Sequence, residues 1–179
     1  VHSHIDHLLG LIKWASDNNI KKVAIHIITD GRDTPAKSAC KYLTQIESCI
    51  KKFNTGKIAS ICGRYWIMDR NLLWERTEKA YANLTDPDIK VKNISAQDYI
   101  KKSYDKNITD EFIEPIRMSD NYLKDGDSLV CFNFRPDRAR QIIKSLAEKN
   151  FSDFERKIIP NIDIVTFTQY DINFPVKVA

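Results

Sequence analysis

The chain has 179 residues, of which 42% are hydrophobic and 29% charged, and its formal net charge is +4. These values are typical of a globular protein that buries a core, so we expect one domain spanning residues 1–179, folded as a monomer. No stretch approaches the roughly 18 consecutive apolar residues of a transmembrane helix, and we expect no membrane partner. The positive charge is weak and spread over polar helix faces, which argues against a nucleic-acid partner.

The four cysteines (Cys40, Cys49, Cys62, Cys131) are scattered, with no pair at metal-binding or redox spacing. Buried free thiols are the simplest interpretation, and they predict a reducing, cytoplasmic setting. The sequence starts at Val1 without an initiator Met or a signal-peptide pattern. It therefore reads as a piece of a longer chain or as a processed product.

The apolar pattern predicts helices alternating with strands. Helices are expected at residues 3–18, 35–53, 71–84, 96–104 and 137–149, and strands at residues 22–29, 58–62, 128–134 and 163–168. Residues 110–118 are ambiguous and are interpreted as a short edge strand. The alternation predicts an α/β fold, a layered α/β/α domain with a mostly parallel sheet.

Five of the nine arginines fall in three short runs, each placed after a predicted strand. The runs are residues 29–35, 63–70 and 132–138, and they contain Arg32, Arg64, Arg70, Arg135 and Arg138. Ligands in open α/β sheets bind just beyond the carboxyl ends of strands. Since the planar guanidinium matches carboxylate and phosphate oxygens two at a time, the runs predict a site for a small, multiply charged anion. Arg138 is expected in the first turn of the following helix, where free backbone N–H groups also favour anions.

Two features near these runs, Asp33 and the histidines at the start of the chain, have competing interpretations. Asp33 lies just before Pro35. It is interpreted as a helix cap, as a carboxylate that accepts a substrate hydroxyl hydrogen bond or takes its proton, or as both. His2 and His4, together with Asp6 and His7, resemble a metal-ligand pattern. However, residues 2 and 4 would not share a helix face, so a single histidine contact to a substrate oxygen is the better interpretation.

The sequence contains no Gly-rich phosphate loop, no serine nucleophile elbow and no His/Asp cluster suited to two metal ions. The chain therefore has groups to hold a phosphorylated acid, but no group that would attack phosphorus.

Taken together, these residues resemble the substrate-binding, or phosphotransferase, domain of cofactor-independent (2,3-bisphosphoglycerate-independent) phosphoglycerate mutases. The resemblance follows the family order from Val1-His2-Ser3-His4 almost to the end of the chain. Its other matching motifs are Asp30-Gly31-Arg32-Asp33-Thr34-Pro35, Gly63-Arg64-Tyr65, Met68-Asp69-Arg70, Trp74-Glu75-Arg76, Lys79-Ala80-Tyr81, Thr109-Asp110-Glu111-Phe112, Phe132-Asn133-Phe134-Arg135-Pro136-Asp137-Arg138-Ala139-Arg140 and Thr168-Gln169-Tyr170-Asp171.

The resemblance implies an isomerase of glycolysis and gluconeogenesis that interconverts 3-phosphoglycerate and 2-phosphoglycerate through a phosphoserine intermediate. It implies that the transferase domain is inserted in an alkaline-phosphatase-like domain, which carries the nucleophilic serine and two manganese ions. That phosphatase domain is absent from this chain, so the chain alone is expected to hold no metal and to be inactive.

The family's substrate-binding positions map onto His2, Arg32, Asp33, Arg64, Arg70, Arg135 and Arg138, with Asp33 as the candidate for handling the glycerate hydroxyl proton. Three alternatives stay open. They are a related phosphomutase acting on another phosphorylated metabolite, a non-catalytic module that binds phosphorylated metabolites, and a metal-dependent hydrolase built on His2 and His4.

Overall fold

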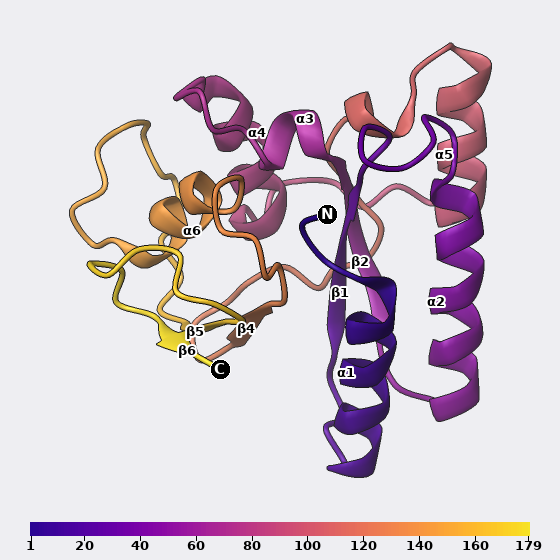
Figure 1. Cartoon of the computed structure of the whole chain (residues 1–179), viewed down its shortest axis with the longest axis horizontal. Helices are drawn as coiled ribbons and strands as arrows, with labels where there is room; N and C mark the ends of the chain where they lie inside the picture. Colours follow the sequence, from indigo (N-terminus) through magenta and orange to yellow (C-terminus); the bar gives the residue numbers. More distant parts are fainter.

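A computed structural model describes residues 1–179 (Figure 1). Its helices are α1 (Ile5–Asp17), α2 (Ala39–Phe53), α3 (Arg64–Ile67), α4 (Trp74–Thr85), α5 (Ala96–Asp105), the 3-10 helix η1 (Asp110–Phe112) and α6 (Arg140–Ala147). Its strands are β1 (Ala24–Thr29), β2 (Lys57–Gly63), β3 (Ile116–Arg117), β4 (Ser128–Cys131), β5 (Asp163–Thr166) and β6 (Lys177–Val178). None of the helices is long and apolar enough to span a lipid bilayer.

The strands form two small sheets rather than the one expected. The first has the order β1-β2-β3 and the second the order β4-β5-β6. The β1–β2, β4–β5 and β5–β6 pairs are parallel, whereas β3 runs antiparallel to the edge of β2. The predicted α/β class and the edge strand within residues 110–118 are therefore confirmed, but the single continuous sheet was wrong.

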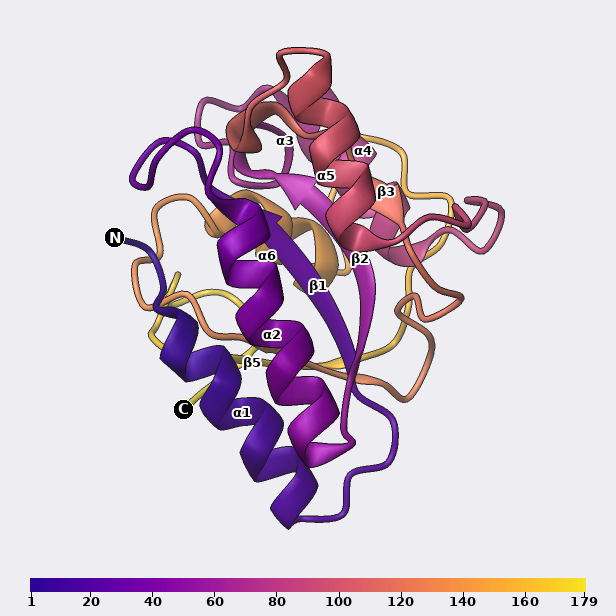
Figure 2. The same cartoon turned by 90° about the vertical axis from the view of Figure 1, so that its right-hand side faces the viewer.

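Helices cover the first sheet on one side, where α1 and α2 lie side by side in front of β1 (Figure 2). Ile12 of α1, Ile25 of β1 and Ile46 of α2 are buried together there. Further along the sheet, Leu43 of α2 and Ile61 of β2 are buried in a second cluster that α5 completes. This apolar layer explains why β1 and β2 are almost continuously hydrophobic in sequence.

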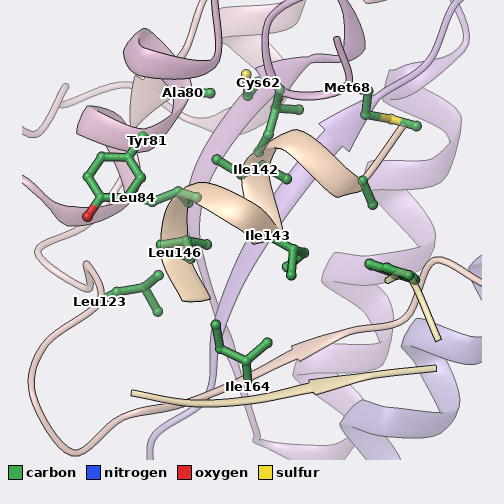
Figure 3. Close-up of a cluster of buried hydrophobic side chains, with 13 residues drawn as sticks. Cys62, Met68, Ala80, Tyr81, Leu84, Leu123, Ile142, Ile143, Leu146 and Ile164 are labelled. Carbon is green, nitrogen blue, oxygen red and sulfur yellow. The ribbon is translucent and has the colours of Figure 1, made fainter. Parts of the chain in front are cut away.

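The largest core cluster lies on the other side of the first sheet and joins it to the second (Figure 3). Helix α6 is central to it, since Ile142, Ile143 and Leu146 are buried on that helix between α4 and β5. Cys62 at the end of β2 belongs to the same cluster as Ile164 of β5. The apolar contact through α6 thus holds the two sheets, and the loops at their strand ends, in a fixed relation.

Helix α2 begins at Ala39 instead of residue 35, because its first turn is capped from a distant part of the chain. Oδ2 of Asp110 accepts hydrogen bonds from the backbone N–H groups of Ser38 (2.8 Å) and Ala39 (2.9 Å). A carboxylate at a helix N-terminus satisfies free donors and favours the local dipole. Residues 30–38 consequently stay in a loop.

The third arginine run also departs from the predicted elements. Strand β4 ends at Cys131 because the N–H groups of Phe134 (2.9 Å) and Arg135 (3.3 Å) donate to the carbonyl of His2 instead of a strand. Helix α6 begins at Arg140, so Arg138 lies in the turn before it and not in its first turn. Three short elements, α3, η1 and β6, were not predicted from the sequence.

Candidate anion-binding site

The first two arginine runs meet at the buried side chain of Arg64, which is only 3% exposed. Its Nη1 donates to Oδ1 of Asp30 (2.5 Å) and to Oδ2 of Asp33 (2.8 Å). Burial lowers the pKa of Arg64, but its hydrogen bonds to the two aspartates outweigh burial and leave the pKa raised. The hydrogen bond from Arg64 in turn lowers the pKa of Asp33, so Asp33 is an ionised carboxylate at neutral pH. The helix-cap interpretation of Asp33 was wrong, because α2 starts beyond it, with Ser38 as its N-cap residue.

His2 lies between two of the aspartates and is only 7% exposed. Its Nε2 is 3.5 Å from Nη2 of Arg64 and 3.7 Å from Oδ2 of Asp33, and its Nδ1 is 3.6 Å from Oδ1 of Asp137. Burial, followed by the charge of Arg64, lowers the pKa of His2, so the ring is neutral near pH 7. Since arginine only donates, Nε2 is the acceptor and the proton lies on Nδ1. That atom is buried without a hydrogen-bond partner, which leaves one free donor inside the site.

Asp137 connects the second and third arginine runs. Its Oδ2 accepts from Nη1 of Arg70 (2.7 Å), and its Oδ1 accepts from Nε of Arg135 (2.9 Å). Both guanidinium groups are about half exposed, at 47% and 48%. The two hydrogen bonds outweigh burial and lower the pKa of Asp137. One carboxylate therefore keeps two solvent-accessible arginines close together, with donors left over for a ligand.

The remaining two arginines have no aspartate partner in the cluster. Arg138 donates to the carbonyl of Met68 (3.2 Å) and is half-buried. Burial lowers its pKa, and the charges of Arg64 and Arg70 lower it further, with a smaller effect from Arg32. Arg32 is largely exposed and donates to Oε1 of Glu111 (3.3 Å). Arg138 is thus a cation facing other cations, an arrangement that an added anion would stabilise.

The backbone of the segment containing η1 packs closely against both of the first two arginine runs. Gly31 has a φ of +67°, and a Cβ on it would lie 2.8 Å from the backbone nitrogen of Glu111. A Cβ on Gly63 would lie only 2.4 Å from the carbonyl oxygen of Glu111. Thr29 also donates from Oγ1 to the carbonyl of Asp110 (2.7 Å). The two glycines thus allow both loops to approach the same piece of backbone.

Side-chain contacts join five of the seven residues predicted for the site, namely His2, Asp33, Arg64, Arg70 and Arg135, the last two through Asp137. The side chains of Arg32 and Arg138 bond instead to Glu111 and to the carbonyl of Met68. The sequence reasoning did not single out the carboxylates that organise them: Asp30, Asp69, Asp110, Glu111 and Asp137. Asp30, Asp69 and Asp137 lie within the three arginine runs, so the recurrence of an aspartate in each run was a usable signal. Asp110 lies some 70 residues from the helix that it caps, and no local sequence pattern predicts a contact over that separation.

The histidine pattern near residue 4 does not form a metal-ligand cluster. His4 caps α1, with Nδ1 accepting from the N–H of Asp6 (3.3 Å), while His2 is turned toward Arg64 and Asp33. No group of three or more His, Cys, Asp and Glu side chains is arranged to hold a metal ion.

In this α/β protein, arginine-containing loops follow β1, β2 and β4, at the strand ends where open α/β sheets bind ligands. Residues 1–172 match the family described as the BPG-independent PGAM N-terminus, and the chain belongs to this family of phosphoglycerate mutases.

Two curated relatives and one solved structure illustrate the similarity. The chain is 74% identical over 179 residues to the 2,3-bisphosphoglycerate-independent phosphoglycerate mutase of Prochlorococcus marinus subsp. pastoris (strain CCMP1986 / NIES-2087 / MED4), covering 100% of this chain and 33% of the relative. It is 55% identical over the same length to the enzyme of that name from Prochlorococcus marinus strain MIT 9313, again covering 100% of this chain and 33% of the relative. The crystal structure of Leishmania mexicana phosphoglycerate mutase at low cobalt concentration superposes with a TM-score of 0.89 at 26% identity, over 97% of this chain and 34% of that one. The chain thus spans about a third of the length of the proteins it matches.

Proposed function

We propose that this chain is the substrate-binding, phosphotransferase part of a phosphoglycerate mutase that interconverts 3-phosphoglycerate and 2-phosphoglycerate. One observation carries the proposal: in a chain of this family, Arg64 contacts His2 and Asp33, and Asp137 beside His2 holds Arg70 and Arg135. The substrate has a carboxylate and a phosphate at opposite ends of a three-carbon acid, and the cluster offers several guanidinium groups to grip both. In the proposed reaction, this part holds the glycerate moiety after phosphate removal and lets it reorient.

The accessible arginines are the best candidates for the first contact with the substrate. Arg70, Arg135 and Arg32 are exposed, and Arg138 lacks a carboxylate partner. Each guanidinium presents five N–H donors, so a single aspartate contact leaves most of them available. Arg64 is buried and already bonded to two aspartates, which suits it to orient Asp33 and His2 in addition to any ligand contact.

Asp33 is proposed to bind the glycerate hydroxyl as a hydrogen-bond acceptor. Because the hydrogen bond from Arg64 lowers its pKa, Asp33 is ionised at neutral pH and is a weaker base than a carboxylate poised near pH 7. The neutral ring of His2, with its free Nδ1 proton, is proposed to donate to a substrate oxygen.

The nucleophilic serine, the alkaline-phosphatase-like domain around it and the two manganese ions are assigned in this proposal to the part of the relatives that this chain does not span. The acidic groups present here do not fit a manganese pair, since Asp30 and Asp33 are bonded to Arg64 and no cluster of three ligands exists. When bound in the longer protein, the metal ions would activate the serine and stabilise charge on the transferring phosphate. The chain alone is accordingly expected to bind phosphoglycerate weakly and to leave it unconverted.

The test is to express the intact gene product and follow 3-phosphoglycerate by phosphorus NMR, which resolves the two isomers. Conversion to 2-phosphoglycerate that drops at least about tenfold in Arg70→Ala and in Arg135→Ala supports the proposal. Arg140→Ala is the matched control, because the Arg140 guanidinium bonds to the carbonyl of Tyr170 (2.7 Å) and not to the cluster. Binding without conversion would support a non-catalytic module instead, and faster turnover of another phosphorylated metabolite would support a related phosphomutase.

A further inference from the structure

Three successive backbone N–H groups in the loop between α3 and α4 are held by buried side chains. Oδ2 of Asp69 accepts from the N–H of Asn71 (2.9 Å) and from that of Leu73 (3.0 Å). Oε1 of Gln141, on helix α6, accepts from the N–H of Leu72 between them (3.0 Å). Asp69 is 4% exposed and Gln141 5% exposed, so neither hydrogen-bond set competes directly with bulk water.

The loop needs this support because its backbone is in an unfavourable conformation. Leu72 has a φ of +61°, in the left-handed region where a branched side chain crowds its own backbone. Its side chain is 65% exposed, so little apolar burial compensates for the conformation. The hydrogen bonds that the backbone N–H groups of residues 71–73 donate to the two buried side chains therefore hold residue 72 in place.

The side chain of Gln141 is oriented by a second hydrogen bond. Its Nε2 donates to Oγ1 of Thr77 (3.2 Å), a side chain of α4 that is completely buried. This contact fixes which end of the amide faces Leu72. Gln141 follows Arg138 by three residues, so it links the loop that begins after Arg70 directly to the segment that carries Arg135 and Arg138.

We propose that Gln141 and Asp69 are positioning residues that lock residues 70–73 to α6 and so fix Arg70 relative to Arg135 and Arg138. Neither residue belongs to the anion cluster itself. The distance between the two arginine runs is set through the backbone of the loop, in addition to the direct contact of Arg70 with Asp137. The inference deepens the proposed function and rests on it for its kinetic consequence, but the locking of the loop is a separate claim.

Gln141→Met tests the inference, because it keeps the length and approximate volume of the side chain and removes both hydrogen bonds. In the intact gene product we expect kcat/KM for 3-phosphoglycerate to fall about tenfold or more, since small misplacement of a binding group costs rate steeply. We also expect faster hydrogen–deuterium exchange of the amides of residues 71–73. Gln97→Met is the matched control, since Gln97 donates to the carbonyl of Cys40 and to Thr44, away from the site.

Leu72→Gly in the Gln141→Met background separates positioning from a general loss of stability. Glycine adopts a positive φ without strain, so the double variant should recover a large part of the lost kcat/KM. Wild-type exchange rates at residues 71–73 in Gln141→Met would overturn the inference, as would an equal kinetic loss in Gln97→Met. Absence of 3-phosphoglycerate turnover by the wild-type gene product would instead overturn the proposed function, and the exchange measurement would still decide whether Gln141 locks the loop.

Discussion

Arg64 and Asp33 form an ion pair that is buried at one end and open at the other. Nη1 of Arg64 lies 2.8 Å from Oδ2 of Asp33, the guanidinium side chain being 3% exposed and the carboxylate side chain 26%. The same Nη1 contacts Asp30 at 2.5 Å, so the buried cation has two acidic partners. Burying a charge is costly unless it is paired, and here the pairing is duplicated.

Because Arg64 has two acidic partners, we expect the effects of substituting the two aspartates on the free energy of unfolding to be strongly non-additive. We expect Asp33→Asn alone to lower the free energy of unfolding by about 1 kcal/mol, because Asp30 still neutralises Arg64. The Asp30→Asn/Asp33→Asn double variant should lose about 3 to 5 kcal/mol, because the buried guanidinium is then unpaired. Urea unfolding of the four proteins measures the coupling, and simple additivity of the two single losses would contradict this account.

The stability of the protein is expected to fall on mild acidification because of His26. Burial, followed by the charge of Arg117, lowers the pKa of His26 from 6.5 to about 4. Between these two pH values the unfolded chain binds a proton that the folded chain does not. The free energy of unfolding is therefore unaffected by His26 above pH 6.5 and decreases as the pH falls from 6.5 toward 4. The shift corresponds to at most about 3 kcal/mol.

His26→Gln is the variant that isolates this effect. Nδ1 of His26 lies 2.8 Å from Oγ of Ser60, and a glutamine amide retains a polar partner for that hydroxyl. Thermal unfolding between pH 7 and pH 4.5 should show a shallower slope in His26→Gln than in the wild type. Parallel slopes would mean that another group controls the acid sensitivity.

Gly10 is predicted to be a site of easy stabilisation. It lies inside α1, and a Cβ on it would meet no atom within 4 Å. Gly10→Ala should raise the free energy of unfolding by about 0.5 to 1 kcal/mol through helix propensity and a less flexible unfolded chain. Gly126→Ala is the matched control. It has the same open space but a φ of +83°, so it should lose about 1 to 2 kcal/mol.

Gly63→Ala is predicted to damage the fold and the anion site together. The new Cβ would be 2.4 Å from the carbonyl oxygen of Glu111 and 2.7 Å from the backbone nitrogen of Ile113. Since both neighbours are backbone atoms, the segment must move, at a cost of about 3 kcal/mol. Denaturant unfolding should show a lower free energy of unfolding, and a titration with 3-phosphoglycerate should show weaker binding. Wild-type stability would mean that the η1 segment can move at little energetic cost.

Arg117 is an arginine that the protein uses for structure alone. It is 1% exposed, and its guanidinium donates to the carbonyls of Asp86 (2.8 Å) and Ala82 (3.4 Å), and from two nitrogens to that of Asn83. These carbonyls lie at the end of α4. That of Ala82 also accepts from the N–H of Asp86 (2.9 Å), whereas those of Asn83 and Asp86 have no partner within the helix. Arg117→Lys should destabilise the protein by about 2 to 3 kcal/mol, because an ammonium cannot reproduce the fork. Unaltered thermal unfolding in this variant would show that the fork is dispensable.

The sequence predicted most of the elements, because their periodicity is strong. Helix α1 and strand β1 were placed within two residues at each end, and the apolar pattern that defines them is the one buried in the core. The division into two sheets could not be predicted, since it depends on which strands pair and not on where they lie. Strand β6 has two exposed residues, which give no alternation to detect.

The candidate site was predictable in composition but not in organisation. Arginines that follow strands indicated a cationic centre, and the structure connects Arg64, Arg70 and Arg135 through His2, Asp33 and Asp137. The pairing of Arg70 with Asp137, or of α2 with Asp110, could not be predicted, because each joins segments about 70 residues apart. The boundaries of α2 and α4 were misplaced for the same reason, since side chains from distant segments hold the backbone just before each helix.

The dependence of α2 on Asp110 also sets an order of assembly. Ser38 and the carboxylate that caps it are 72 residues apart, and Thr29 and its partner carbonyl are 81 residues apart. Contacts of such separation require closure of a long loop, so they form late compared with the local contacts inside α1 or α5. The arginine loops that rest on this segment should therefore be among the last parts of the chain to become ordered, and in pulse-labelled refolding the amides of Ser38 and Ala39 should gain protection after those of the helices.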